Sequence, residues 1–358
     1  MIAGFFAPLP PARTGVADYA AHLLTALRQQ GEVRTNAPGT VNLYHLGNNQ
    51  LHAEIYRAAL RHPGVIVLHD AVLHHFALGH LSRNEYLAEF TYNYGAWTAG
   101  LAADLWASRA TSASDPRYFA HPLIRRVCET SRAVIVHNPA AARIVRSHAR
   151  EARVFEIPHL LFPEPTPSDA DLVEVRHRLG VRPLEPLCGL FGHLRESRRV
   201  RSVIEACGRA GMRLLVAGPC SSDLAKALAP YFAQPWVIRR DYSSANDFRL
   251  LTHAVDICAN LRYPAAGETS GISVRLMGAG KAVLVTDSEE NARYPETSCV
   301  RIESGLAERD HLTAVLDWLK QFPAHARAIG ARAADHVRRE HDPARVAEAC
   351  WSVLRAAA

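Results

Sequence analysis

The sequence alternates short apolar runs, each bounded by turn residues, with longer amphipathic segments. This alternation is typical of parallel strands joined by crossover helices, so it restricts the chain to the α/β class. In the first half we expect strands at residues 2–6, 41–45, 65–68, 133–136 and 154–157. Between the first two, residues 17–30 place Tyr19, Leu23, Leu24 and Leu27 at helical spacing, which predicts a helix.

A proline-rich segment divides the chain. Residues 158–167 contain Pro158, Pro163, Pro165 and Pro167 and show no periodicity, which is typical of a linker. The alternation then begins again, with strands expected at residues 187–191, 213–216, 236–238, 256–259 and 282–286. Helices are expected near residues 199–210, 222–229, 244–253 and 270–278, and residues 309–358 are expected to be mostly helical.

The chain has 358 residues, which is more than one ordinary hydrophobic core supports. We therefore expect two Rossmann-like domains that face each other across a cleft. Residues 1–160 would form the first domain and residues 161–340 the second. Residues 341–358 would form a C-terminal helix that crosses back to the first domain.

Composition excludes some classes of partner. The chain carries 41 Lys and Arg against 35 Asp and Glu, a net charge of +6, but its arginines are spread over many segments. A modest positive charge suits a phosphate-bearing ligand or an anionic membrane surface. The sequence lacks the dense basic stripe of a nucleic-acid binder.

The seven Cys form no CxxC pair and are expected to be reduced core residues. With no signal peptide and no apolar run of roughly 20 residues, we expect a cytoplasmic protein, and peripheral contact with the inner membrane face stays open.

The segment VIVLHDAVLHHF delivers His69 and Asp70 to the carboxyl end of a strand, where open α/β sheets bind ligands. His69 is expected to contact a polar ligand group there. A metal site built from His69, Asp70 and one of His74 and His75 is the alternative, but adjacent histidines point to different faces of a helix. His74 and His75 are therefore expected to be solvated or to cap the helix, and no metal site is predicted.

Two further segments suit an anionic ligand. In PLPPARTGVADYAAHLLTAL, Gly15 lies where a turn passes into a helix, which lets a ligand approach the helix amides closely. In LCGLFGHLRESRRV, three arginines (Arg195, Arg198 and Arg199) lie beside a helix start. Basic residues are unfavourable at that end of a helix, so they indicate an external anion such as phosphate, with a solvated charged face as the alternative.

The most specific segment is VDICANLRYPAAGETSGISVRLMGAGKAVLVTDS. A loop containing Arg262 leads to Glu268, and the small residues Ser270 and Gly271 then open a helix whose amides suit a phosphate. Glu268 is badly placed for the anion itself but suits sugar hydroxyls; a capping role is its alternative. The DxD pattern of Asp169 and Asp171 resembles a metal signature, but its position favours a helix cap instead.

These segments together resemble the retaining GT-B glycosyltransferases of the family 4 (glycosyl transferases group 1) type, over nearly the whole chain. The resemblance implies that Glu268 corresponds to the first Glu of the family's EX7E motif, which contacts the donor sugar. It implies that amides at Ser270, Gly271 and the adjoining Ile272 hold the donor diphosphate, that Gly15 corresponds to the N-terminal glycine loop, and that VLHD supplies the acceptor-domain histidine. Arg198 corresponds to the family's phosphate-binding lysine, with His193 in place of the neighbouring arginine.

The second Glu of the motif, which ordinarily binds the nucleotide ribose, is replaced. Arg275 occupies that place, and the spacing from Glu268 is one residue short. Arg262 and Arg275 are candidates for replacement contacts to phosphate.

The resemblance implies a metal-independent hexosyltransferase that needs no cofactor. It would move a sugar from a UDP- or GDP-sugar to a glycan, lipid-linked or small-molecule acceptor, and His69 would position the sugar. The donor would bind mainly to the second domain and the acceptor to the first. Two alternatives remain: a catalytically impaired nucleotide-sugar-binding subunit or scaffold, and a sugar-nucleotide epimerase or phosphorylase on the same fold.

Overall fold

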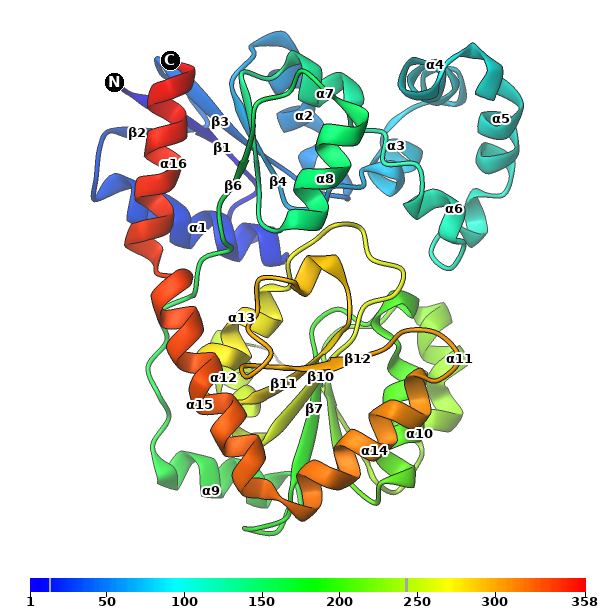
Figure 1. Cartoon of the computed structure of the whole chain (residues 1–358), viewed down its shortest axis with the longest axis vertical. Helices are drawn as coiled ribbons and strands as arrows, with labels where there is room; N and C mark the ends of the chain where they lie inside the picture. The colour runs from blue at the N-terminus through cyan, green and yellow to red at the C-terminus, as the bar shows by residue number, and fades with distance from the viewer. Residues whose placement is uncertain (13, 242–243) are drawn as a thin grey trace. The chain divides into compact units, whose positions relative to one another are not determined.

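The computed structural model describes residues 1–12, 14–241 and 244–358 (Figure 1). It divides into two compact units. The first unit contains residues 1–162, 264–271 and 341–358, and the second contains residues 163–263 and 272–340. Residues 264–271, the loop that contains Glu268, thus belong to the first unit although they lie between segments of the second in sequence.

The first unit contains a six-stranded parallel sheet in the order β2-β1-β3-β4-β5-β6. Its strands are β1 (Ala3–Phe6), β2 (Val33–Thr35), β3 (Val41–Leu46), β4 (Val65–Leu68), β5 (Ala133–Val136) and β6 (Val154–Glu156). The chain leaves β1 for the edge strand β2 and then returns to the other side of β1, so the winding direction reverses between β1 and β3.

The helices of this unit include α1 (Gly15–Arg28), α2 (Ala53–Arg61), α8 (Pro139–His148) and α16 (Pro343–Ala357). Between β4 and β5 the chain forms a helical excursion of α3 (His74–His80), α4 (Arg83–Tyr94), α5 (Ala99–Ala107), α6 (Pro116–Phe119) and α7 (Arg125–Thr130). Short 3-10 turns are η1 (Gln50–His52), η2 (Ala96–Thr98) and η3 (Arg109–Thr111). Figure 1 shows α4, α5 and α6 grouped beside the sheet, where they share a small core around Tyr86, Phe90 and Tyr118.

The C-terminal helix α16 belongs to the core of the first unit. Its apolar residues pack with those of α1 and with β1 and β3 in one buried cluster. The indole of Trp351, 3% exposed, donates a hydrogen bond from Nε1 to the carbonyl of Leu27 at 3.0 Å. The C-terminal helix therefore returns to the N-terminal unit, as the sequence predicted, and Figure 1 shows it together with α1, against which it packs.

The second unit contains a six-stranded parallel sheet in the order β12-β11-β10-β7-β8-β9. Its strands are β7 (Leu187–Phe191), β8 (Arg213–Ala217), β9 (Val237–Arg240), β10 (Ile257–Asn260), β11 (Ala282–Thr286) and β12 (Val300–Ile302). Its helices are α9 (Asp169–Arg178), α10 (Val200–Arg209), α11 (Ser222–Phe232), α12 (Ala245–Ala254), α13 (Gly271–Gly278), α14 (Glu308–Gln321) and α15 (Pro323–Glu340), with turns η4 (Glu196–Arg198) and η5 (Glu289–Asn291). Here the winding direction reverses between β7 and β10.

The two Rossmann-like sheets confirm the predicted fold class. Each of the expected strands lies within two residues of an observed one, whereas the edge strands β2 and β12, three residues each, were not predicted. The seven cysteines are free and six are buried, as expected of reduced core residues. In the described part of the chain, no helix has the length and apolar character needed to cross a bilayer.

Candidate functional site

In the second unit, polar groups gather where the winding direction of the sheet reverses. Ligands of open α/β sheets bind outside the carboxyl ends of the strands at this switch point, here β7 and β10. Arg198, in the turn after β7, donates from Nη1 to Oδ1 of Asn260 at 2.6 Å. Asn260 ends β10, is 5% exposed, and donates from Nδ2 to Oγ of Ser273 in α13. A guanidinium group is thus fixed across the switch point.

The backbone at the end of β7 leaves room beside this guanidinium. Gly192 has φ +93°, a left-handed conformation that glycine adopts at little cost. A Cβ atom on Gly192 would lie 3.5 Å from Nη2 of Arg198 and 3.4 Å from Cγ1 of Ile272, the second residue of α13. Partial burial lowers the pKa of the neighbouring His193, and the charges of Arg195 and Arg198 lower it further. This edge of the sheet is therefore electropositive and suited to an anion.

The three arginines after β7 diverge. The Nε of Arg199 donates to both carboxylate oxygens of Glu308 at 2.7 and 3.0 Å, and the Glu308 side chain is only 2% exposed. Arg199 has φ +55°, an unusual conformation for a residue with a side chain. Arg195 and Arg199 instead line a pocket of about 480 Å³ next to α11 and α14. Among the described residues, Arg198 is the only one of these three arginines with a side-chain hydrogen bond at the switch point, which it donates to Asn260.

Arg262 and Arg275 also have contacts within the second unit. The guanidinium of Arg275 hydrogen-bonds to Glu164 of the linker and lies 4.2 Å from the centre of the Phe248 ring. The Arg275 side chain is 14% exposed. The amide of Arg262 donates to Oγ1 of Thr286 at 2.9 Å. Burial raises the pKa of Tyr294, and the nearby charge of Arg262 opposes that rise in part.

The loop that contains Glu268 packs within the first unit. The amides of Ala71 and Val72 donate to the carbonyl of Ala266 at 2.9 and 3.1 Å. Asn138, which follows β5, donates from Nδ2 to the carbonyl of Gly267 at 3.0 Å and to Oγ1 of Thr269 at 2.9 Å. These bonds tie the loop to the carboxyl ends of β4 and β5.

Glu268 closes this loop on itself, because its Oε2 accepts a hydrogen bond from the amide of Ala266 at 2.6 Å. Ser270 is 5% exposed. Gly271 lies against the first unit, since a Cβ atom there would be 3.2 Å from Nε2 of His159. The bond between Glu268 and Ala266 lies within the loop and does not cap α13, which begins at Gly271, and Glu268 as a whole is half-buried.

His69 belongs to a larger group of histidines. His45, His69, His137 and His159 lie at or just after the carboxyl ends of β3, β4, β5 and β6, four neighbouring strands. The ring of Tyr19, from α1, lies with its centre 4.8 Å from those of His69 and His159, 5.2 Å from that of His137 and 6.0 Å from that of His45. We call these five residues the histidine cluster.

Burial keeps three imidazoles of the histidine cluster, those of His45, His69 and His137, neutral. It lowers the pKa of His45 to about 3, with His137 and His52 adding to the shift, and that of His137 to about 4. It also lowers the pKa of His69 well below its ordinary value. His69 retains 8% exposure at the edge of the cluster, so a ligand that reaches this edge meets a neutral histidine.

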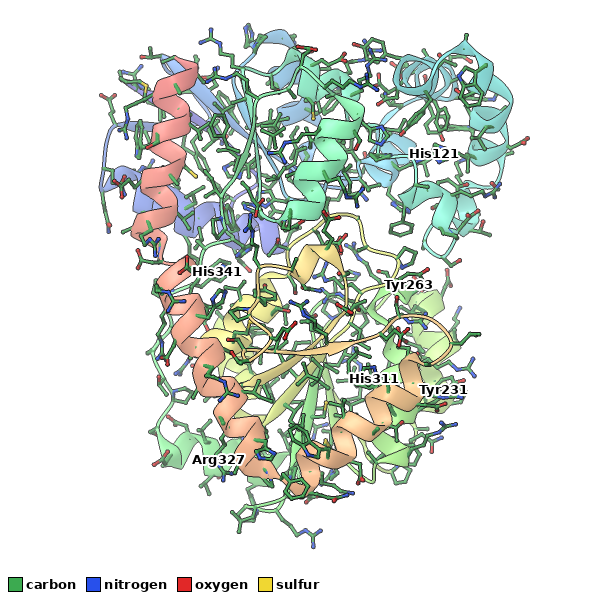
Figure 2. The ribbon with its side chains drawn as sticks, viewed as in Figure 1. His121, Tyr231, Tyr263, His311, Arg327 and His341 are labelled. Atoms are coloured by element: carbon green, nitrogen blue, oxygen red, sulfur yellow. The ribbon has the colours of Figure 1, made fainter. Side chains whose placement is uncertain are left out.

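Other candidates behave differently. Gly15 begins α1, and a Cβ atom there would meet no described atom within 4 Å, whereas the amide of Ala17 in the first turn donates to Oγ1 of Thr14 at 3.1 Å. The expectation for His74 is wrong: it is fully buried and its ring bonds to the carbonyl of His121 and the hydroxyl of Tyr86, both at 2.8 Å. Figure 2 labels His121 within the helical excursion. His75 is also engaged, by Asn48 at 3.2 Å and the carbonyl of Ser112 at 3.1 Å.

Metal-binding geometry is absent from the described residues, where no group of three His, Cys, Asp or Glu side chains could hold an ion. The DxD pattern forms a capping box: the Ser168 amide donates to Oδ2 of Asp171 at 3.1 Å, and the Asp171 amide donates back to Ser168 at 3.2 Å. Both carboxylates of the pattern lie in the first turn of α9, as the cap interpretation predicted.

Sequence reasoning missed Asn260, Asn138, His45, His137 and His159. A signal was available, because each of these polar residues ends or follows an apolar strand. Carboxyl ends of parallel strands meet at one edge of a sheet, which brings such residues together.

No protein-family model and no curated protein sequence matches the chain. Solved structures do. HepE of Anabaena in complex with UDP-glucose matches with TM-score 0.71 and 15% identity, over 99% of this chain and 100% of the other. Sucrose-phosphate synthase of Thermosynechococcus elongatus matches with TM-score 0.69 and 13% identity, over 99% and 98%.

WaaG, a glycosyltransferase involved in lipopolysaccharide biosynthesis, matches with TM-score 0.62 and 15% identity, over 99% of each chain. At these identities the likeness shows the fold alone. The chain therefore has the GT-B fold, with two Rossmann-like domains.

Proposed function

We propose that the chain is a glycosyltransferase that takes a sugar from a nucleoside diphosphate sugar. The observation that carries the proposal is Arg198, fixed by Asn260 across the switch point of the second sheet. Gly192 leaves the strand end next to it open, and α13 begins there. A diphosphate leaving group gathers negative charge as its bond to the sugar breaks, and a positioned guanidinium stabilises that charge.

The first unit supplies a neutral imidazole and a carboxylate, and no cationic group is needed there. His69 is neutral at the edge of its sheet, and Glu268 lies on a loop held by Asn138. Neutral imidazoles and a carboxylate suit sugar hydroxyls, which are both donors and acceptors. We propose that His69 and Glu268 bind the transferred sugar, with further contacts from amides at Gly15, Ser270, Gly271 and Ile272.

The finer features of the proposal rest on the family resemblance and on the neighbours. HepE was crystallised with UDP-glucose, and this supports a UDP-sugar as the first donor to test; a GDP-sugar is the second. We propose retention of configuration, by front-face attack in which the donor phosphate assists deprotonation of the acceptor. We also propose independence from metal and cofactor, a sugar, lipid-linked or small-molecule acceptor, and work in the cytoplasm, with peripheral contact at the inner membrane face.

One observation favours a second candidate, a nucleotide-sugar-binding subunit with little activity of its own. Arg275, which stands in place of the second motif Glu, bonds to Glu164 and lies over Phe248. These contacts engage its guanidinium within the second unit. If no other group binds the ribose, donor binding persists only weakly and turnover is lost.

A thermal-shift screen with UDP-, GDP-, ADP- and TDP-sugars in EDTA tests the proposal. A ligand that binds only the folded state, at a concentration of about 100 times its Kd, raises the free energy of unfolding by about 2.7 kcal/mol. The Tm then rises by several degrees. We expect one nucleotide family to raise the Tm of the wild-type chain without metal. Arg198→Gln should abolish most of that rise, because it removes the charge that faces the diphosphate.

Arg201→Gln is the matched control, since Arg201 lies in the same helix–turn region but pairs with Glu205 on the surface at 2.9 Å. It should retain the ligand-induced rise. Absence of any rise, or a rise that depends on a divalent metal, would contradict the proposal. Binding without release of nucleoside diphosphate in the presence of acceptor extracts would favour the inactive subunit.

A further inference from the structure

His45 and His69 form a buried hydrogen-bonded pair. Nδ1 of His45 lies 3.0 Å from Nε2 of His69, and the two rings are stacked, with their centres 5.3 Å apart. His45 is 0% exposed. Because both rings are neutral, one proton lies between these two nitrogens, and one ring is the donor.

Neighbouring histidines have tautomers fixed by the backbone. Nδ1 of His52 lies 2.9 Å from the carbonyl of His45, and Nδ1 of His137 lies 2.9 Å from the carbonyl of Ile157. Nδ1 of His159 lies 2.8 Å from the carbonyl of Leu160. A carbonyl accepts only, so each of these Nδ1 atoms carries the proton.

The tautomer of the His45 pair follows from the second ring nitrogen of His45. Its Nε2 is buried without a hydrogen-bond partner in the described part of the chain. If His69 were the donor, His45 would carry its proton on that Nε2, and this buried N–H would have no acceptor, which is unfavourable. Buried orphan N–H groups are rarer than under-satisfied acceptors. His45 is therefore the donor, from Nδ1 to Nε2 of His69.

We propose that His45 is a positioning residue that fixes His69 in its Nδ1–H tautomer, so that His69 donates a hydrogen bond to a ligand oxygen and cannot act as a general base. With Nε2 occupied by His45, Nδ1 is the ring nitrogen of His69 left for a ligand. A protonated Nδ1 has no lone pair to accept a proton. The identity of the ligand oxygen, a sugar hydroxyl, rests on the proposed function; the tautomer does not.

Nitrogen-15 NMR of histidine side chains reads the tautomer directly, without ligand or activity. The full-length chain is labelled on histidine ring nitrogens, and the His69 signals are assigned by their loss in His69→Gln. At neutral pH we expect His69 Nδ1 to show the chemical shift of a protonated ring nitrogen and Nε2 that of an unprotonated one. In His45→Leu, which removes the donor, the Nε2–H form should gain population.

His45→Asn is the conservative variant, because its side-chain amide nitrogen takes the place of Nδ1 and can still donate. It should keep His69 in the Nδ1–H form even if His45→Leu folds poorly. His74→Leu is the control for loss of a buried histidine elsewhere in the unit, since His74 lies in the helical excursion and bonds to Tyr86. It should leave the His69 signals unchanged.

Titration with the nucleotide sugar then tests the consequence for ligand binding. His45→Leu should weaken binding of the donor sugar by about two- to tenfold, the worth of one hydrogen bond, and His45→Asn should restore most of it. A wild-type His69 protonated on Nε2, or a tautomer unaffected by His45→Leu, would overturn the inference. The expected spectra in a chain that binds no nucleotide sugar would refute the proposed function and leave the tautomer assignment standing.

Discussion

Mild acid should destabilise the first unit, because this unit buries neutral histidines. Burial lowers the pKa of His45 to about 3 and that of His52 and His137 to about 4. In the unfolded chain these groups return to a pKa of about 6.5. Between those values the unfolded state binds more protons than the folded state, so stability rises with pH and is lost as pH falls from about 6.5 towards the folded pKa.

The size of the effect follows from the same values. Going from about pH 7 to about pH 5.5, each such histidine costs roughly 1.2 kcal/mol, because the unfolded form gains protons that the folded form refuses. The three together cost roughly 3 to 4 kcal/mol, and His69 and His74, whose pKa values shift in the same direction, add to this. That is a large part of the roughly 5–15 kcal/mol that stabilises a typical domain.

The assay is pulsed hydrogen exchange in a urea series at both pH values, read by mass spectrometry. Peptides from β5 report on the first unit and peptides from β7 on the second. The second unit should lose less stability, because fewer of its histidines have a strongly lowered pKa. Burial lowers the pKa of His253 to about 4, and the pKa values of His193 and His336 shift in the same direction.

Carboxylates contribute little in this range, since their ordinary pKa values of about 4 lie below it. A first unit whose unfolding free energy changes by less than about 1 kcal/mol would refute the reasoning, because it would mean that the histidine cluster is hydrated or already protonated when folded. An equal loss in both units would remove the link to the cluster.

Three substitutions test other contacts. Arg198→Gln should weaken donor binding by roughly tenfold to a hundredfold, the worth of a hydrogen bond to a charged group, in calorimetric titrations; unchanged affinity would remove Arg198 from the site. Glu308→Gln keeps one acceptor for the guanidinium of Arg199 but removes the buried negative charge, whose side chain is 2% exposed, and should lower the free energy of unfolding by about 1–3 kcal/mol in urea; a loss below about 0.5 kcal/mol would contradict this. Gly330→Ala should cost about 1–3 kcal/mol in the same assay, because its Cβ would lie 2.0 Å from the carbonyl oxygen of Gly280, and a stabilised variant would show that the helix shifts freely.

Much of the fold could be predicted from the sequence because buried parallel strands are continuous apolar runs. Residues 65–68, 133–136, 187–191 and 282–286 were predicted with the bounds observed for β4, β5, β7 and β11. The edge strands β2 and β12 escaped because an arginine stands in the middle of each three-residue strand and interrupts the apolar run. The helical excursion gives no strand signal, and its core depends on contacts between Tyr86 and Tyr118, which lie far apart in sequence.

Residues of the candidate site could be predicted only where local sequence and strand order are enough to place them. Arg195, Arg198 and Arg199 look equivalent in sequence, and the structure separates them through distant partners, Asn260 for Arg198 and Glu308 for Arg199. His74 was misread because its partners, the hydroxyl of Tyr86 in α4 and the carbonyl of His121 after α6, lie outside its own helix. Long-range pairing of this kind leaves no local pattern, so the histidine cluster could be foreseen strand by strand but not as a cluster.

Transfer of labelled sugar tests the central claim most directly. The chain is incubated in EDTA with the donor that the thermal screen identifies, radiolabelled in its sugar, together with lipid and glycan acceptor fractions. A glycosyltransferase predicts label in one acceptor fraction with equimolar release of nucleoside diphosphate, and loss of both with Arg198→Gln. Donor that is bound but never consumed, or sugar that is isomerised without entering any acceptor, would contradict the account.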